Sequence, residues 1–122
     1  MIKNISNTEA LISKIIGGIE EVKGDEVNLL DLREIKNSFC SYFIICNGTS
    51  NTHVNAIVNS IQKTVSKTLK EKPYHTEGQE NSEWVLIDYI DVVVHVFQKQ
   101  IRDHYSLENL WGDAKSLRIT TN

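Results

Sequence analysis

The chain has 122 residues, of which 40% are hydrophobic and 24% are charged, and its formal net charge at pH 7 is −3. This length and composition are typical of one globular domain with a buried core, and the negative charge argues against binding nucleic acid by bulk charge, which requires lysine and arginine. No apolar run reaches the roughly 20 residues of a membrane span, and no basic-then-apolar secretory signal begins the chain, so we expect a cytoplasmic protein without a membrane partner.

The charges are unevenly distributed along the chain. Residues Ile35 to Lys70 contain no Asp or Glu but four lysines, whereas Pro73 to Gln98 contain five acids and no Lys or Arg. This pattern predicts a two-sided molecule, with one basic helix surface and one acidic surface. The lysines also fit an ordinary solvated helix face.

The first predicted element is a helix from about Asn7 to Val22, because its apolar residues recur at helical spacing. Gly17 and Gly18 weaken this helix by roughly 1 kcal/mol each relative to alanine, which suggests close packing of the helix against a sheet. Gly24 is a natural helix end, and Val27–Leu32 then reads as a strand.

A second strand is expected over Tyr42–Asn47, after a turn or short helical piece. The loop Asn47-Gly48-Thr49-Ser50 follows, and Ser50 or Asn51 is expected to cap a second helix that ends near Pro73. The apolar positions of that helix cover four turns: Val54, Ile57, Val58, Ile61, Val65 and Leu69.

A strand pair is predicted over Glu83–Tyr89 and Asp91–Gln98, because valine, isoleucine and aromatic residues flank a short acidic turn. A short helix over Gln100–Tyr105 and a further helical turn or two capped by Ser106 are expected next. Ser116–Thr120 alternates in the manner of an edge strand. Together these elements predict an α/β single-domain sandwich, with a mixed four- or five-stranded sheet and helices mainly on one face.

The number of helices suggests an exposed sheet surface. Two long helices and a short one can cover one face of such a sheet but not both. Strand residues alternate between faces, so Val85 and Ile87 share the side opposite Trp84 and Leu86, and both sets are apolar. We therefore expect an uncovered aromatic and aliphatic face that marks a protein interface. Tyr89 lies on the face opposite Trp84, so at least one of these two aromatics is expected to be accessible.

The sequence offers little support for catalytic or metal chemistry. The Gly48 loop ahead of a helix could bind an anion, but magnesium-dependent transfer needs a nearby carboxylate pair and no acid follows until Glu71, so helix capping is favoured. No cysteine and histidine pair has zinc-site spacing, and Cys46 continues an apolar run as a core residue would. His95 lies in a valine-rich strand, where a hydrogen-bonded sheet histidine is favoured over a general base. We therefore expect no enzyme activity and no cofactor.

Four segments together resemble the ribosomal silencing factor family, also called the Iojap-like proteins. They are Val27-Asn-Leu-Leu-Asp-Leu-Arg33, Tyr42-Phe-Ile-Ile-Cys-Asn-Gly-Thr-Ser-Asn-Thr-His-Val54, Glu77-Gly78 with Trp84 to Phe97, and Arg102-Asp-His-Tyr-Ser-Leu-Glu-Asn-Leu-Trp-Gly-Asp-Ala114. They occur in the family's order and cover roughly residues 8–114 of a single domain.

The resemblance implies a nucleotidyltransferase-like α/β fold without the catalytic carboxylates. It also implies a translation repressor that binds the large ribosomal subunit through that subunit's fourteenth ribosomal protein and blocks joining of the small subunit. A role in assembly of the large subunit and a homodimer are further implications, and direct binding of nucleic acid is expected to be small.

The expected partner contacts follow from motif position and strand alternation, since an acidic, aromatic sheet surface suits a basic ribosomal protein. The main contacts are expected at Trp84, Leu86, Asp88, Tyr89 and Asp91, with Arg102, Tyr105 and Trp111 as supporting or rim residues. Two rival functions stay open: a nucleotide-binding or transferase-type enzyme that uses His95 or the Gly48 loop, and a self-associating structural protein.

One residue departs from the family pattern. The family usually has glycine between the Tyr and Asp of the acidic turn, where this chain has Ile90. Because a β-branched residue is strained at positive φ, we expect the turn to keep Ile90 at negative φ or to be longer.

Overall fold

The structure, a computed structural model, describes residues 7–36, 38, 40–105 and 115–119. The elements in chain order are α1 (Asn7–Glu21), β1 (Asp25–Asp31), β2 (Tyr42–Gly48), α2 (Asn51–Leu69), β3 (His75–Glu77), β4 (Trp84–Asp88), β5 (Val92–Gln98), α3 (Lys99–Tyr105) and β6 (Lys115–Ile119). The expected helical turns after Ser106 lie outside the described residues. Among the described helices, none is long and apolar enough to cross a membrane.

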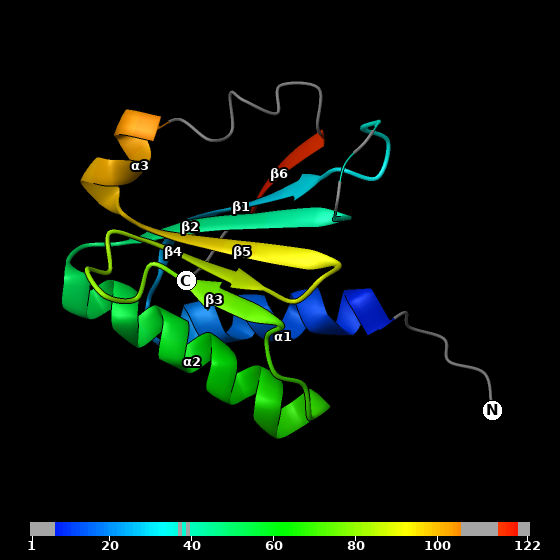
Figure 1. The fold of residues 1–122 in the computed structure, drawn as a ribbon, viewed down its shortest axis with the longest axis horizontal. Helices are drawn as coiled ribbons and strands as arrows, with labels where there is room; N and C mark the ends of the chain where they lie inside the picture. The colour runs from blue at the N-terminus through cyan, green and yellow to red at the C-terminus, as the bar shows by residue number, and fades with distance from the viewer. Residues whose placement is uncertain (1–6, 37, 39, 106–114, 120–122) are drawn as a thin grey trace.

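The strands form one mixed sheet in the order β3-β4-β5-β2-β1-β6 (Figure 1). The central pair, β2 and β5, is parallel, and every other pair is antiparallel. The mixed sheet is confirmed, but it has six strands rather than four or five. The additional strand is β3, whose three residues are too few and too polar to produce a strand pattern in the sequence.

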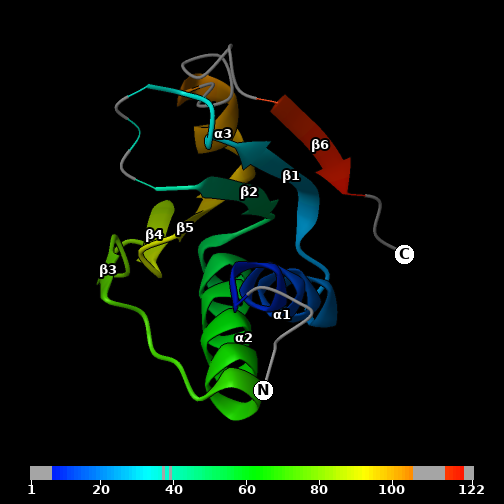
Figure 2. The same ribbon diagram turned by 90° about the vertical axis from the view of Figure 1, so that its right-hand side faces the viewer.

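Helices α1 and α2 lie together on one face of the sheet, and α3 lies on the other side (Figure 2). We call the face under α1 and α2 the inner face and the opposite one the outer face. The predicted alternation is confirmed, because Val85 and Ile87 pack in the inner core whereas Trp84 and Leu86 pack against the outer core. Helices mainly on one face are therefore also confirmed.

The glycine pair of α1 packs against α2 and not against the sheet. A Cβ atom at Gly18 would lie 2.8 Å from the Ile61 Cα atom, whereas a Cβ at Gly17 would meet nothing within 4 Å. The Ser60 hydroxyl also donates to the Gly18 carbonyl oxygen at 2.7 Å. Gly18 thus permits a close contact between α1 and α2. The expectation of a contact with the sheet was wrong, because a glycine pair in a sequence indicates close packing but not whether a helix or a sheet is the packing partner.

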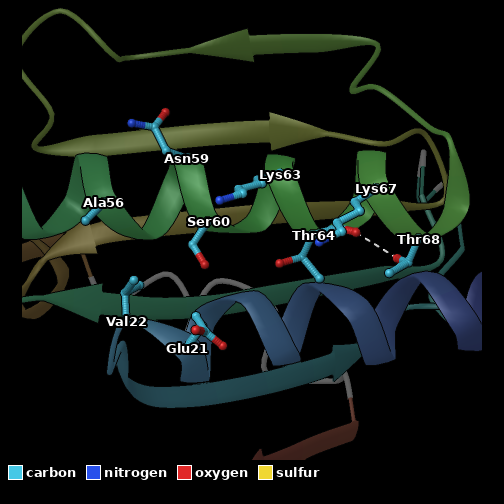
Figure 3. Close-up of a pocket in the computed structure, with 9 residues that line it drawn as sticks. All are labelled: Glu21, Val22, Ala56, Asn59, Ser60, Lys63, Thr64, Lys67 and Thr68. Carbon is cyan, nitrogen blue, oxygen red and sulfur yellow. Dashed lines mark hydrogen bonds between the residues drawn. The ribbon is translucent and has the colours of Figure 1, made fainter.

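The exposed sides of α1 and α2 border a shallow groove (Figure 3). The groove is lined by the end of α1 and by one side of α2, from Glu21, Val22, Ala56, Asn59, Ser60, Lys63, Thr64, Lys67 and Thr68. Lys63 and Lys67 place part of the predicted basic surface here, on the helical side of the molecule.

Candidate partner-binding surface

The outer face is covered at its β1–β2 side by two local structures. Ile101 of α3 packs on the outer core, and so do Ile35 and Cys40 from the segment between β1 and β2. Arg102 fixes α3 in place, because its Nη1 atom donates to the Glu26 carbonyl oxygen and to Asn47 Oδ1. The Arg102 side chain is 6% exposed, so it supports the fold from within and does not form a rim.

This cover makes the accessible part of the outer face narrower than the sequence predicted. Phe97 is fully buried, and Phe43 and Val93 are each 3% exposed. Trp84, Leu86 and Asp88 are half-buried, and they follow one another at alternate positions of β4. We call these three residues the β4 strip. The expected open aromatic face is therefore corrected to a strip along one strand.

The aromatic residue of the strip is held in one orientation by its neighbours. The Trp84 ring stacks on Phe97 with ring centroids 4.8 Å apart. Its Nε1–H donates to Nδ1 of His95 at 3.1 Å, and His95 is itself packed edge-on against Phe43 at 4.6 Å. An acceptor Nδ1 requires the neutral imidazole with its proton on Nε2. Trp84 thus presents a rigid, half-exposed edge.

The turn after β4 contradicts the expectation for Ile90. Its φ angle is +78°, in the region that disfavours side chains branched at Cβ. The Asp91 N–H donates to the Tyr89 carbonyl oxygen at 3.0 Å, which is the hydrogen bond of a γ-turn centred on Ile90. Asp88 accepts the Ile90 N–H at 2.7 Å through Oδ1. The hydrogen bonds of this tight turn therefore hold Ile90 at a positive φ, although steric repulsion disfavours that angle for a β-branched residue.

Acidic groups surround the exposed end of the strip. Asp91 is exposed, and its carboxylate accepts a hydrogen bond from the Thr8 hydroxyl at 3.3 Å. On the neighbouring edge strand, Glu77 pairs with His75 at 2.6 Å. The register places His75 opposite Asp88 and Glu77 opposite Leu86, so these side chains share the outer face. Two of the predicted acids, Asp88 and Glu77, thus lie on the outer face at the β3–β4 edge.

Tyr89 is the expected contact that this surface does not display. Its side chain is 6% exposed and packs in the inner core, and burial raises the pKa of its hydroxyl to about 12, with a smaller contribution from Glu71. The expectation that at least one of Trp84 and Tyr89 is accessible holds through Trp84. The Tyr105 side chain and Trp111 lie outside the described residues.

The Gly48 loop has the geometry of a helix cap. Ser50 accepts the His53 N–H at 3.1 Å, and the Thr49 N–H donates to His53 Nδ1 at 2.9 Å. His53 Nε2 in turn donates to the Val22 carbonyl oxygen at 2.8 Å, which ties α2 to the end of α1. The N–H groups of Thr49 and His53 therefore already have hydrogen-bond acceptors within the protein, as the prediction of a helix cap implies.

The two cysteines, the other candidates for a reactive group, are buried or half-buried. Cys46 is fully buried, and desolvation raises its pKa to about 12; the half-buried Cys40 has its pKa raised to about 11 by the same cause. Thiolates are the reactive form, so both cysteines are poor nucleophiles in the folded chain. Over the described part of the chain, no cluster of three His, Cys, Asp or Glu side chains could hold a metal ion.

Two exposed apolar residues near the end of β4 were not among the residues predicted from the sequence. Tyr74 is 76% exposed and Ile90 is 60% exposed. The signal for Tyr74 was weak, because the loop after Pro73 gave no strand pattern that would have placed it beside β4. The signal for Ile90 was an isoleucine in a turn that also contains Asp88 and Asp91, where an apolar side chain is expected to be exposed.

Three comparisons connect this structure with known proteins. A family model described as "Ribosomal silencing factor during starvation" matches residues 5–122. A ribosomal silencing factor of Halalkalibacterium halodurans is 37% identical over 115 residues, which cover 94% of this chain and 96% of the relative. The mouse protein named "Mitochondrial assembly of ribosomal large subunit protein 1" is 36% identical over 76 residues, covering 60% of this chain and 33% of that protein.

A solved structure shares the fold. The crystal structure of a Chromobacterium violaceum protein superposes with a TM-score of 0.81 at 36% sequence identity, and the match covers 88% of each chain. At this identity the likeness extends to the sequence as well as to the arrangement of helices and sheet.

Proposed function

This chain belongs to the ribosomal silencing factor family, and we propose that it binds the large ribosomal subunit and keeps the small subunit from joining it. A role in assembly of the large subunit is part of the proposal, as the name of the mouse relative suggests. We infer that the docking partner is the fourteenth ribosomal protein of that subunit and that the protein acts in the cytoplasm. The family resemblance supports this partner, and the aromatic, acidic surface described above suits a basic protein.

The observation that carries the proposal is the β4 strip with its acidic end. Trp84 is fixed by Phe97 and His95, so little side-chain entropy is lost when a partner covers it. Tryptophan is among the residues that dominate interface energies. The segment Pro73–Gln98 contains five acids and no Lys or Arg, so it contributes negative charge around the strip, which suits a basic ribosomal protein.

The proposed contacts are Trp84, Leu86, Asp88 and Asp91. The Asp88 carboxylate also accepts a hydrogen bond from the Ile90 N–H. Replacing Asp88 would therefore disturb the turn as well as remove a charge. The side chain of Asp91 is exposed and makes one described hydrogen bond, to Thr8. Asp91 is therefore the cleaner position for a test of charge. Tyr89 and Arg102 support the surface from the interior.

The test is co-sedimentation of purified variants with large subunits. We expect Trp84→Ala to weaken binding by about tenfold or more, in the range of interface residues that are central to binding. We expect Asp91→Lys to weaken binding as well, because it places a cation before a basic partner, and to lose most effect at high salt. Circular dichroism of each variant shows whether the fold is retained.

The matched control is Glu21→Lys, which makes the same change of charge on the helical side of the molecule (Figure 3). We expect it to bind normally. Normal co-sedimentation of folded Trp84→Ala and Asp91→Lys would show that the binding surface lies elsewhere. Equal loss in all three variants would show that net charge, and not this surface, governs binding.

A further inference from the structure

Large apolar side chains are rarely exposed in the described part of the chain. The three that are exposed are Tyr74 at 76%, Ile90 at 60% and Leu117 at 58%. The Tyr74 N–H donates to the Asp88 carbonyl oxygen at 2.7 Å, so Tyr74 lies at the same corner of the sheet as the turn that carries Ile90. Leu117 belongs to β6, at the opposite edge of the sheet.

The Ile90 backbone is held in its disfavoured conformation from both sides. Asp88 Oδ1 accepts the Ile90 N–H, and the Tyr89 N–H donates to the Val92 carbonyl oxygen at 2.9 Å. The Asp91 carbonyl oxygen accepts from the Ser41 and Tyr42 N–H groups at 2.9 and 3.1 Å, which joins the turn to β2. The shape of the turn is therefore fixed by its surroundings, whichever side chain occupies its tip.

An isoleucine is a poor residue for this position on the grounds of stability alone. Glycine occupies positive φ without strain, whereas a β-branched side chain does not. Burial of the side chain would offset that strain, but the Ile90 side chain is mostly in solvent. Strained residues persist where function uses them, and an exposed apolar side chain at a rigid tip can serve an interface.

We propose that Ile90 is an apolar anchor that enters a pocket on the basic ribosomal protein to which this chain docks. The inference rests on the proposed function and adds a specific contact to it. The partner's pocket is apolar inside and bordered by lysine or arginine, because Asp88 and Asp91 flank Ile90 on either side. A rigid turn presents the anchor with little loss of entropy on binding.

The test separates stability from binding. Ile90→Gly removes the apolar side chain and the strain together, so we expect it to melt no lower than the parent chain and yet to bind purified large subunits about tenfold more weakly. Ile90→Val keeps an apolar, β-branched side chain, so its affinity is expected to stay within about fivefold of the parent. Leu117→Ala is the matched control at the far edge of the sheet and is expected to bind normally.

The outcomes of this test are distinct from those of the surface test. Parental affinity of Ile90→Gly would overturn the anchor, and if Asp91→Lys still lost binding, the docking surface itself would stand. Equal loss in Ile90→Gly and Ile90→Val would also overturn it, since the apolar side chain would then not be what matters. Light scattering tests whether Ile90 instead binds a second copy of this chain. If Ile90→Gly lost self-association but kept subunit binding, the anchor would serve a dimer and the proposal would fail.

Discussion

At the scale of single residues, hydrogen bonds decide what the surface presents. His95 occupies a strand position that could have suggested a general base, yet its ring accepts the Trp84 indole N–H and sits edge-on against Phe43. Ile90 keeps a strained, positive φ because hydrogen bonds from neighbouring residues fix the shape of the turn. These hydrogen bonds hold Trp84 and the turn at Ile90 in defined positions, which lowers the entropic cost of binding.

The ion pair of Asp31 and Arg33 gives a residue-scale prediction about pH. Two Arg33 side-chain nitrogens donate to the Asp31 carboxylate at 2.9 and 2.7 Å, and this contact is the main reason that the pKa of Asp31 falls from 3.8 to about 2. A carboxyl group whose pKa is lower in the folded chain than in the unfolded chain stabilises the fold at pH values above the unfolded pKa. That stabilisation is lost as the pH falls through the folded pKa.

We therefore expect the free energy of unfolding to decline between about pH 4 and pH 2, and Arg33→Gln to remove part of that decline. The pair is exposed to solvent, so its contribution to this decline is expected to be small. Urea titrations of both proteins at pH 6, 4 and 2.5 measure the difference. An identical pH dependence in the variant would mean that the pair contributes nothing to stability.

At the scale of elements, the contact between α1 and α2 depends on one glycine of an adjacent pair. A Cβ at position 18 would be forced into the backbone of α2 at Ile61, whereas position 17 faces open space. The same substitution at two neighbouring positions should therefore have opposite effects. This contrast isolates helix packing from helix propensity.

We expect Gly18→Ala to lower the free energy of unfolding by about 1–3 kcal/mol through overpacking. Gly17→Ala is expected to raise it by up to about 1 kcal/mol, because alanine is the better helix former at an exposed site. Thermal and urea unfolding of the two variants give the comparison. Similar effects at both positions would show that the two helices adjust their spacing freely.

Element by element, the sequence was sufficient where periodicity is long and local. The apolar stripes of α1 and α2 and the alternation along β4 and β5 predicted which faces are buried. Periodicity says nothing about what covers an outer face, so the sealing of Phe97 by α3 and the β1–β2 segment could not be foreseen. The short β3 depends on its pairing with β4, and the positive φ of Ile90 depends on the hydrogen bonds of its turn; apolar periodicity encodes neither.

At the scale of the whole molecule, the proposed binding edge and the helical side carry different charge. Lys63 and Lys67 border the groove of α2, whereas Asp88 belongs to the β4 strip on the outer face and Asp91 lies in the turn that follows β4. Acids at the β3–β4 edge would favour approach to a basic partner through the strip. Docked through its β4 strip on the outer face, the molecule would turn helices α1 and α2 away from the partner (Figure 2).

The most direct test of this account is a subunit-joining measurement. Pure protein is added to separated large and small subunits, and the amount of whole ribosome formed is followed by sedimentation, with Glu21→Lys and Asp91→Lys in parallel. We predict that the parent chain and Glu21→Lys reduce joining in a dose-dependent, salt-sensitive manner and that Asp91→Lys does not. Undiminished joining in the presence of saturating parent chain would contradict the account.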